Sequence, residues 1–360
     1  MKDVIRIAGA FVGVLVGAGF ASGQEILVFF VNFGLWGLLG TLLSAAVFVF
    51  LGMALAGMGS RLQAQSHKVV VEAICGPYLG RLVDGLITFF MFAVTVVMLA
   101  GAGALLEQQF EFPAALGSAL VTVAVVAAVC LDVRRVITLI GAVTPLLVLV
   151  SVAVAAYAVF TREADTATLE TIASEQTAGA RYWWLGALLY VSYNIVAGVP
   201  ILAIMGGTAR NERTAAWGGL LGGLVLGGLM LAIALGLLSR LDTVAGAPMP
   251  MLMLVSEVSP MLSLLVALVI LGMILNTAVG TLYSFCARFL PAGTSRFRLG
   301  TVVIGLAAYG CSLLGFVSLV GKVYPIFGYL GFFLMAAILV AWIRQRRSPL
   351  LANPDDVRAT

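Results

Sequence analysis

The sequence predicts an all-α membrane protein with ten transmembrane helices in two inverted five-helix repeats. Hydrophobic residues make up 62% of the 360 residues, charged residues make up 10%, and the mean hydropathy is +1.13. A soluble domain carries about 25% charged residues, so this chain has too little charge to cover a water-facing surface. Its apolar runs approach the roughly 20 residues with which a helix crosses a bilayer.

The spans are taken as helices, because open sheets cannot satisfy their backbone in lipid. Polar breaks between the apolar runs place the ten spans at 4–31, 35–57, 82–106, 114–131, 136–160, 182–206, 214–239, 260–287, 299–316 and 318–343. The segment 59–81 is expected at the cytoplasmic interface. We expect one transmembrane domain over 1–344, made of repeat one (1–160), an acidic external loop (161–181) and repeat two (182–343), and a cytoplasmic tail over 345–360.

The distribution of basic residues sets the predicted orientation. With a cytoplasmic N-terminus, only Arg162, Arg181 and Arg240 of the 20 Lys and Arg residues fall in outside segments, and Lys322 falls within a span. All the others lie in cytoplasmic segments, as the positive-inside rule requires. The same placement explains the net charge of +4 without nucleic acid. We therefore expect a multi-pass protein of the bacterial inner membrane with both termini in the cytoplasm.

The two halves resemble each other at an offset near 180 residues. Trp36-Gly37-Leu38-Leu39-Gly40 corresponds to the segment 217–222, Gly141–Pro145 to Gly321–Pro325, and Ala18-Gly19 to Ala197-Gly198. Five helices separate the copies, so the second copy enters the membrane from the opposite side. In transporters, such inverted repeats place the solute near the bilayer midplane, between paired broken helices.

Helices 1 and 6 contain the predicted breaks. Helix 1 carries Gly17-Ala18-Gly19-Phe20-Ala21-Ser22-Gly23-Gln24-Glu25, and helix 6 carries Tyr193-Asn194-Ile195-Val196-Ala197-Gly198-Val199-Pro200. Glycine weakens a helix, and proline removes a backbone donor. Exposed helix ends offer N–H groups to an anion and C=O groups to a cation, which suits a zwitterion. Close packing of small residues is the alternative for helix 1, and it is the interpretation we favour for Gly219, Gly223 and Gly227 of helix 7.

The phrase over residues 17–25 resembles the signature of the YkvI-like bacterial membrane proteins. These are similar to the amino acid–polyamine–organocation superfamily, whose members share the LeuT-type fold and include many presumed amino acid permeases. The resemblance implies that the N–H groups of Ala18 and Gly19 bind the carboxylate of the solute. The expected solute-binding residues are Gly17, Ala18, Gly19 and Phe20 of helix 1 and Tyr193, Asn194, Ala197 and Gly198 of helix 6.

The resemblance also implies a sodium site between helices 1 and 8. Its ligands here are the carbonyls near Gly13 and Val16, together with the side chains of Asn276 and Thr277. The alternative for the Asn276-Thr277 pair is hydrogen bonding between helices. Phe89, Phe92 and Thr95 of helix 3 are candidates for the opposite wall of the solute pocket, although aromatic residues on membrane helices commonly serve packing.

Glu25 and Lys322 are the clearest charged residues within predicted spans, where charge is costly. Relatives of this fold often close the outer gate with an ion pair between helices 1 and 10, and we expect Glu25 and Lys322 to form it. The alternatives are snorkelling toward the external interface and, for Glu25, proton coupling.

These features favour a secondary transporter that moves a small zwitterionic or amine solute, an amino acid above all, with Na⁺ as the expected coupling ion. The alternatives are a proton-coupled carrier, a channel or facilitator, and a membrane sensor. The sequence lacks H-E-x-x-H, G-x-S-x-G and paired intramembrane aspartates, so an enzyme is not expected. The four scattered cysteines and the single histidine predict no metal framework. We expect no organic cofactor, and the predicted partners are the solute and the lipid bilayer. The oligomeric state is left open.

Overall fold

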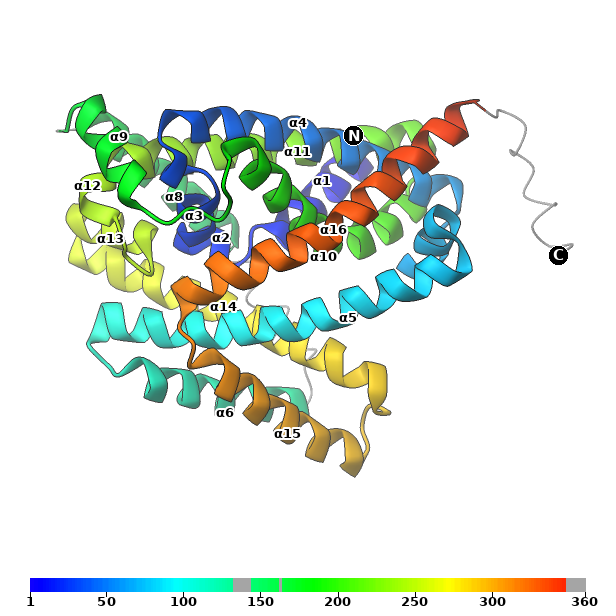
Figure 1. The fold of residues 1–360 in the computed structure, drawn as a ribbon. Coiled ribbons are helices and arrows are strands. Elements are labelled where there is room, and N and C mark those ends of the chain that lie inside the picture. The colour runs from blue at the N-terminus through cyan, green and yellow to red at the C-terminus, as the bar shows by residue number, and fades with distance from the viewer. Residues whose placement is uncertain (132–143, 162–163, 348–360) are drawn as a thin grey trace, which may run out of the picture.

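The structure is a computed structural model that describes residues 1–131, 144–161 and 164–347, and within these every regular element is helical. Figure 1 shows the helices packed along one another in a bundle. In chain order they are α1 (Lys2–Leu15), α2 (Ala18–Ser22), α3 (Gln24–Phe29), η1 (Val31–Phe33), α4 (Leu35–Arg61), α5 (His67–Phe110), α6 (Ala114–Leu131), α8 (Thr144–Phe160), α9 (Thr166–Glu175), α10 (Trp183–Gly207), α11 (Glu212–Ser239), α12 (Leu241–Val244), α13 (Pro250–Val258), α14 (Pro260–Phe289), α15 (Ser295–Ser312) and α16 (Phe316–Arg347).

Seven helices of the described chain are long and apolar enough to cross a membrane. They lie at Leu35–Arg61, Tyr78–Phe110, Ala114–Leu131, Trp183–Gly207, Glu212–Ser239, Pro260–Phe289 and Phe316–Arg344, at seven of the ten predicted spans. The predicted first span is divided into short helices, and the ninth corresponds to α15, whose first turn carries Arg296 and Arg298. The fifth predicted span begins outside the described part of the chain. Gly141, Arg134, Arg135, Arg162 and the tail beyond residue 347 also lie outside it. The count of ten helices therefore stays a prediction.

The first predicted span is interrupted twice. Helix α1 ends at Leu15, and α2 begins at Ala18 after Val16 and Gly17 leave the helical conformation, with ψ angles of 73° and −174°. The second interruption is Gly23, whose φ of 82° is left-handed. Glycine adopts this conformation without the clash that a Cβ atom causes. The glycines of the 17–25 phrase therefore divide the span, as the sequence predicts.

The predicted break in the sixth span is not present. Helix α10 runs without interruption from Trp183 to Gly207, with Pro200 inside it. The neighbouring helices α1, α4 and α16 pack against α10. Proline is tolerated within membrane helices where the surrounding structure satisfies the freed backbone groups. The two repeats are thus asymmetric, because only the first has an interrupted opening helix.

The segment predicted at the cytoplasmic interface, 59–81, is helical over most of its length. Helix α4 continues to Arg61, and α5 already begins at His67. Gly76, with φ of 73° and ψ of 174°, separates the first part of α5 from the apolar part that follows. This combination of positive φ and extended ψ is essentially restricted to glycine, and it is not helical. The position of Gly76 makes the first part of α5 a short helix of its own.

Corresponding helices of the two repeats pack against each other. The pairs are α1 with α10, α4 with α11, α5 with α14, and α6 with α15. In Figure 1, α5, α6, α14 and α15 form one group below a second group made of α1, α4, α10 and α11. Helix α16 contacts α10, α5 and α4 and so links the groups. This pairing is expected when two repeats are related by an axis that passes between them.

Glycine permits the close contact between α4 and α11. A Cβ atom on Gly52 would lie 2.7 Å from the carbonyl oxygen of Gly219, and one on Gly223 would lie 2.6 Å from Cα of Val49. A Cβ atom on Gly227 would overlap the side chain of Ala45. Small residues allow membrane helices to approach in this way. The packing interpretation of Gly219, Gly223 and Gly227 is therefore confirmed.

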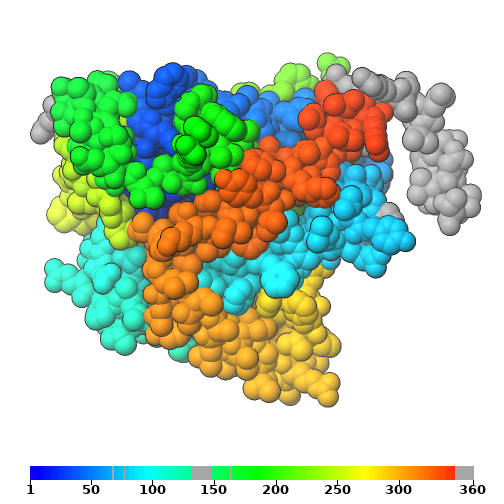
Figure 2. All heavy atoms as spheres, in the orientation of Figure 1, coloured from blue at the N-terminus to red at the C-terminus, as the bar shows by residue number. Residues whose placement is uncertain are grey.

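The outer surface of the spanning helices is apolar. Figure 2 shows α16 (orange) lying across the face of the molecule. Its residues Ile326, Tyr329 and Leu330 are exposed, as are Leu299 and Leu306 of α15. Large contiguous apolar surfaces are rare on soluble monomers. The lipid bilayer is the solvent that suits this surface, so α15 contributes to it despite its two basic residues.

We expect Gly223→Ala to destabilise the protein by about 1–3 kcal/mol, because the added Cβ meets backbone atoms of α4 that have no room to move. The measurement is the apparent melting temperature of the purified protein in detergent. Gly228→Ala is the matched control, because Gly228 lies on the same helix and its Cβ would meet nothing within 4 Å. An equal melting temperature for the two variants would contradict the packing argument.

Candidate functional site

The first interruption leaves backbone groups of helix 1 without partners. Val16 donates to the carbonyl of Val12 and Gly17 donates to the carbonyl of Leu15. Among the described residues, no backbone N–H therefore reaches the carbonyls of Gly13 and Val16. The N–H groups of Ala18 and Gly19, at the start of α2, likewise have no backbone acceptor there. Unsatisfied groups of this kind bind ligands, side chains or water.

A carboxylate of the same helix lies beside the interruption. Glu25, on α3, is only 6% exposed, and its Oε2 accepts a hydrogen bond of 2.8 Å from the hydroxyl of Tyr193 on α10. A Cβ atom on Gly19 would lie 2.8 Å from Cδ of Glu25 and would overlap its Oε1. The sequence assigns Gly19 to close approach of a ligand. In the structure, the group that approaches Gly19 is the Glu25 carboxylate.

Aromatic rings from four helices lie around Tyr193, the hydrogen-bond partner of this carboxylate. The ring of Tyr193 stacks on Tyr324 of α16 at 4.7 Å between centroids, and it lies 5.4 Å from Tyr190, 5.5 Å from Phe29 and 6.4 Å from Phe90. All five side chains are at most 3% exposed. We call them, together with Glu25, the carboxylate–aromatic cluster.

Sequence analysis found only part of this cluster. Tyr193 was singled out because it adjoins the predicted break of helix 6, and Glu25 because it is charged. Phe89 was expected at the wall of the pocket, but it is 64% exposed, and its neighbour Phe90 takes that place. A shift of one residue turns a helical position by about 100°. No sequence signal marked Tyr324, since its contact with Tyr193 joins helices from opposite ends of repeat two.

The other predicted solute-binding residues have different surroundings. Gly198 faces helix 1, because its Cβ would lie 3.4 Å from side-chain atoms of Leu15 and Phe11. Asn194 is buried, and its side-chain amide donates to the carbonyl of Tyr190 in its own helix at 2.9 Å. Ala197 is half-buried. Phe20 is buried and lines a small hollow together with Val16, Ala21, Val148, Ser151, Leu229 and Ile233.

One predicted cation ligand on α14, Asn276, has a side-chain oxygen that accepts no hydrogen bond from the described residues. This oxygen, Oδ1, is buried. Helix α2, which begins two residues after Val16, packs against α14. One turn beyond Thr277, the hydroxyl of Thr281 lies 2.8 Å from that of Thr95 on α5 and donates to the carbonyl of Thr277. Thr95, which was expected at the pocket wall, lies in this contact instead.

Glu25 and Lys322 form no ion pair in this structure. Lys322 is exposed on α16, whereas Glu25 is buried and bonded to Tyr193. None of the ion pairs found among the described residues involves Glu25. The gate between these two residues stays a prediction for another conformation.

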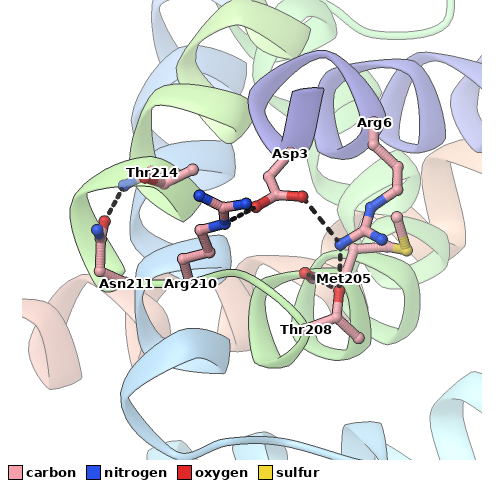
Figure 3. A network of polar contacts seen from close by, with 7 residues as sticks. All are labelled: Asp3, Arg6, Met205, Thr208, Arg210, Asn211 and Thr214. Carbon is pink, nitrogen blue, oxygen red and sulfur yellow. Dashed lines mark hydrogen bonds and ion pairs between the residues drawn. The ribbon is translucent and has the colours of Figure 1, made fainter. Parts of the chain in front are cut away.

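A second set of polar contacts ties the start of α1 to the connection between α10 and α11 (Figure 3). Arg6 donates to the hydroxyl of Thr208 at 3.0 Å and lies 3.5 Å from Asp3, and Arg210 lies 3.8 Å from the other oxygen of Asp3. These side chains are partly exposed, so each pair contributes at most about 1 kcal/mol. They hold the first half of helix 1 against the end of α10.

The segment between α8 and α10 covers the opposite end of helix 1. Glu170 of α9 accepts a hydrogen bond of 2.6 Å from the N–H of Leu35, and the side chain of Asn32 donates to the carbonyl of Thr177 at 2.9 Å. The N–H of Gly179 donates to the carbonyl of Val28 at 2.9 Å. Figure 2 shows this segment (green) lying directly on the residues of η1 and α4 (blue). The second half of helix 1 is therefore covered by this segment.

Comparison with known proteins identifies the family. No family model matches the chain. The membrane protein YkvI of Bacillus subtilis is 31% identical over 350 residues, which cover 95% of this chain and 97% of YkvI. The chain belongs to the YkvI family. Another member, YyaD of B. subtilis, is 27% identical over 341 residues, which cover 94% of this chain and 96% of YyaD. The resemblance seen in the 17–25 phrase is thereby confirmed over nearly the whole chain.

Solved structures show the fold of this YkvI-family member. A manganese transporter of Eremococcus coleocola superposes with a TM-score of 0.60 at 16% identity, over 92% of this chain and 78% of the transporter. Mhp1 in its inward-facing conformation gives 0.57 at 14% identity, over 96% of this chain and 77% of Mhp1. Both have the LeuT-type fold. The protein is therefore a multi-pass membrane protein with a transporter fold.

We expect Gly19→Ala to destabilise this YkvI-family protein by about 1.5–3 kcal/mol. The added Cβ displaces the Glu25 carboxylate and breaks the bond from Tyr193, and hydrogen bonds to charged groups contribute about that much. The apparent melting temperature in detergent measures the loss. Gly9→Ala is the control on the same span, because its Cβ would meet nothing within 4 Å. The Gly19→Ala effect should shrink in a Glu25→Ala background, and an undiminished effect would place the clash elsewhere.

Proposed function

We propose that this protein is a secondary active transporter that moves a small zwitterionic or amine solute by alternating access, coupled to sodium. The supporting observation is the interruption of helix 1 between α1 and α2. It exposes carbonyl and N–H groups in the interior of a transporter fold, where a lipid-facing helix would have none.

Sodium coupling is supported by unpartnered oxygens on two neighbouring helices. The carbonyls of Gly13 and Val16 accept no backbone hydrogen bond among the described residues, and Oδ1 of Asn276 is buried without a partner there. An unsatisfied buried acceptor such as Oδ1 of Asn276 costs about 1–3 kcal/mol, and a bound cation would remove that cost. Carbonyl, amide and hydroxyl oxygens are suitable ligands for a hard cation. We propose that these three residues and Thr277 hold Na⁺.

The coupling ion would act by joining the two groups of helices. Gly13 and Val16 belong to the group of α1, α4, α10 and α11, and Asn276 belongs to the group of α5, α6, α14 and α15. A cation that takes oxygens from both groups stabilises the conformation in which they are close. A ligand shifts a conformational equilibrium only through such a difference in affinity between states. Sodium binding and solute binding would then favour the same conformation.

Proton coupling is the second candidate, and Glu25 is the observation that favours it. The carboxylate is buried and forms no ion pair among the described residues. A buried ionisable group without a counter-ion lowers its energy by taking up a proton. A proton gradient alone would then drive uptake into proteoliposomes, whereas the first proposal requires a sodium gradient. That comparison tests both candidates, and equal uptake without any ion gradient would indicate a facilitator.

We expect Asn276→Ala and Thr277→Ala to abolish the stabilisation that sodium gives the purified protein. In the unaltered protein, sodium at a hundredfold excess over its dissociation constant raises stability by about 2.7 kcal/mol. The measurement is the melting temperature in sodium against potassium at equal ionic strength. Ser284→Ala is the control, because Ser284 is exposed on the same helix and donates only to its own backbone. A sodium shift that persists in both variants would rule out this site.

A further inference from the structure

We propose that the carboxylate–aromatic cluster binds the positively charged amine group of the solute, with Glu25 as its counter-ion. This inference rests on the proposed function and narrows its solute to organic cations, for which a carboxylate on the solute is not required. The sequence assigned Glu25 to a gate with Lys322. The structure instead places its carboxylate beside Gly19 and Tyr193, at the interruption of helix 1.

The first step of the argument concerns charge. Glu25 is 6% exposed within a membrane-spanning region, and no described Lys, Arg or His pairs with it. A buried charge needs a partner or a metal ligand role to offset its desolvation. Buried ionisable groups in membrane proteins commonly mark the path of a substrate or ion. The Glu25 carboxylate supplies a negative charge here when it is ionised, and a cationic ligand would supply its complement and favour the ionised form.

The second step concerns the rings around the carboxylate. Tyr193 and Tyr324 are stacked at 4.7 Å, and Tyr190, Phe29 and Phe90 lie around Tyr193. The face of an aromatic ring attracts an ammonium group, most strongly where water is excluded. Aromatic faces together with one carboxylate are the arrangement by which proteins recognise alkylammonium groups. A neutral or anionic solute gains no electrostatic attraction from the rings or the carboxylate.

The third step concerns the alternative ligands. A solute carboxylate bound at the N–H groups of Ala18 and Gly19 would lie next to the Glu25 carboxylate, which contacts Gly19. Like charges at such a separation repel strongly in a buried site. A divalent metal ion would need more ligands than Glu25 provides, and the described residues contain no group of three or more His, Cys, Asp or Glu side chains. An organic cation is the ligand class that this site fits.

The test uses a matched set of small molecules on the full-length protein in detergent with sodium present. Choline, ethanolamine and putrescine carry the ammonium group. The alcohol 3,3-dimethylbutan-1-ol has the shape of choline without its charge, and propionate carries only a carboxylate. Thermal shift measures binding to the unaltered protein. We expect at least one amine to raise the melting temperature, and neither the neutral alcohol nor propionate to do so.

The variants assign the effect to the cluster. We expect Glu25→Gln to weaken amine binding roughly 10- to 100-fold, the loss of one hydrogen bond to a charged group. Glu25→Asp should retain part of it, and it keeps the test open if Glu25→Gln does not fold. Tyr324→Leu should weaken binding by removing a ring face. Glu175→Gln is the control, because Glu175 is an exposed carboxylate on α9.

Binding and uptake together separate the two proposals. Amine binding that depends on Glu25, with no uptake of the amine into proteoliposomes under any ion gradient, would leave the binding site standing and contradict transport. Uptake of a neutral or carboxylate solute that is unchanged in Glu25→Gln would leave transport standing and overturn the inference. No shift with any amine, or an equal shift with 3,3-dimethylbutan-1-ol and choline, would also overturn it.

Discussion

The hydrogen bond between Tyr193 and Glu25 connects the interrupted helix 1 to the continuous helix α10 at the centre of the molecule. It spans 2.8 Å and is shielded from water on both sides. Glycine at residue 19 leaves room for the carboxylate in this position, since a Cβ atom there would overlap it. The path of helix 1, the position of Tyr193 and the stacking of Tyr193 on Tyr324 of α16 therefore depend on one another. A change in the hydrogen-bond partner of Glu25 would therefore alter the packing of helix 1, α10 and α16.

The two ends of helix 1 are held by different means. At one end, Asp3, Arg6 and Arg210 make partly exposed contacts that are individually weak. At the other, Asn32 and the backbone of Val28 bond to the segment after α9. Between them, no described backbone group bonds to the carbonyls of Gly13 and Val16 or to the N–H groups of Ala18 and Gly19. Weak ties at the ends and unsatisfied groups in the middle are the features of an element that can change its packing when a ligand binds.

The close contact of α4 with α11 differs from the weak contacts at the ends of helix 1. Gly52, Gly219 and Gly223 bring the backbones of the two helices close together. Such an interface resists sliding because backbone atoms have no alternative positions to adopt.

The sequence alone determined the class of protein, the family, and the position of the interruption in helix 1. These follow from composition and from local backbone preferences, which act within a few residues. Glycine weakens a helix, and Gly17 and Gly23 both take non-helical conformations. Local preference failed at Pro200, because packing against α1, α4 and α16 keeps α10 helical. It also gave Phe89 in place of Phe90, because a uniformly apolar helix carries no pattern that marks its inner face.

Only the tertiary structure decided which residues meet at the site. Glu25 and Tyr193 are separated by 168 positions in the chain, and Tyr324 is farther still. The sequence marked Glu25 as unusual and paired it with Lys322, because a charge in a span suggests an ion pair. In this conformation its neighbour is Tyr193. Which side chains bury Glu25 depends on how the helices cross. Contacts between distant helices are fixed by the shapes of their surfaces, and a single sequence does not record which surfaces are matched.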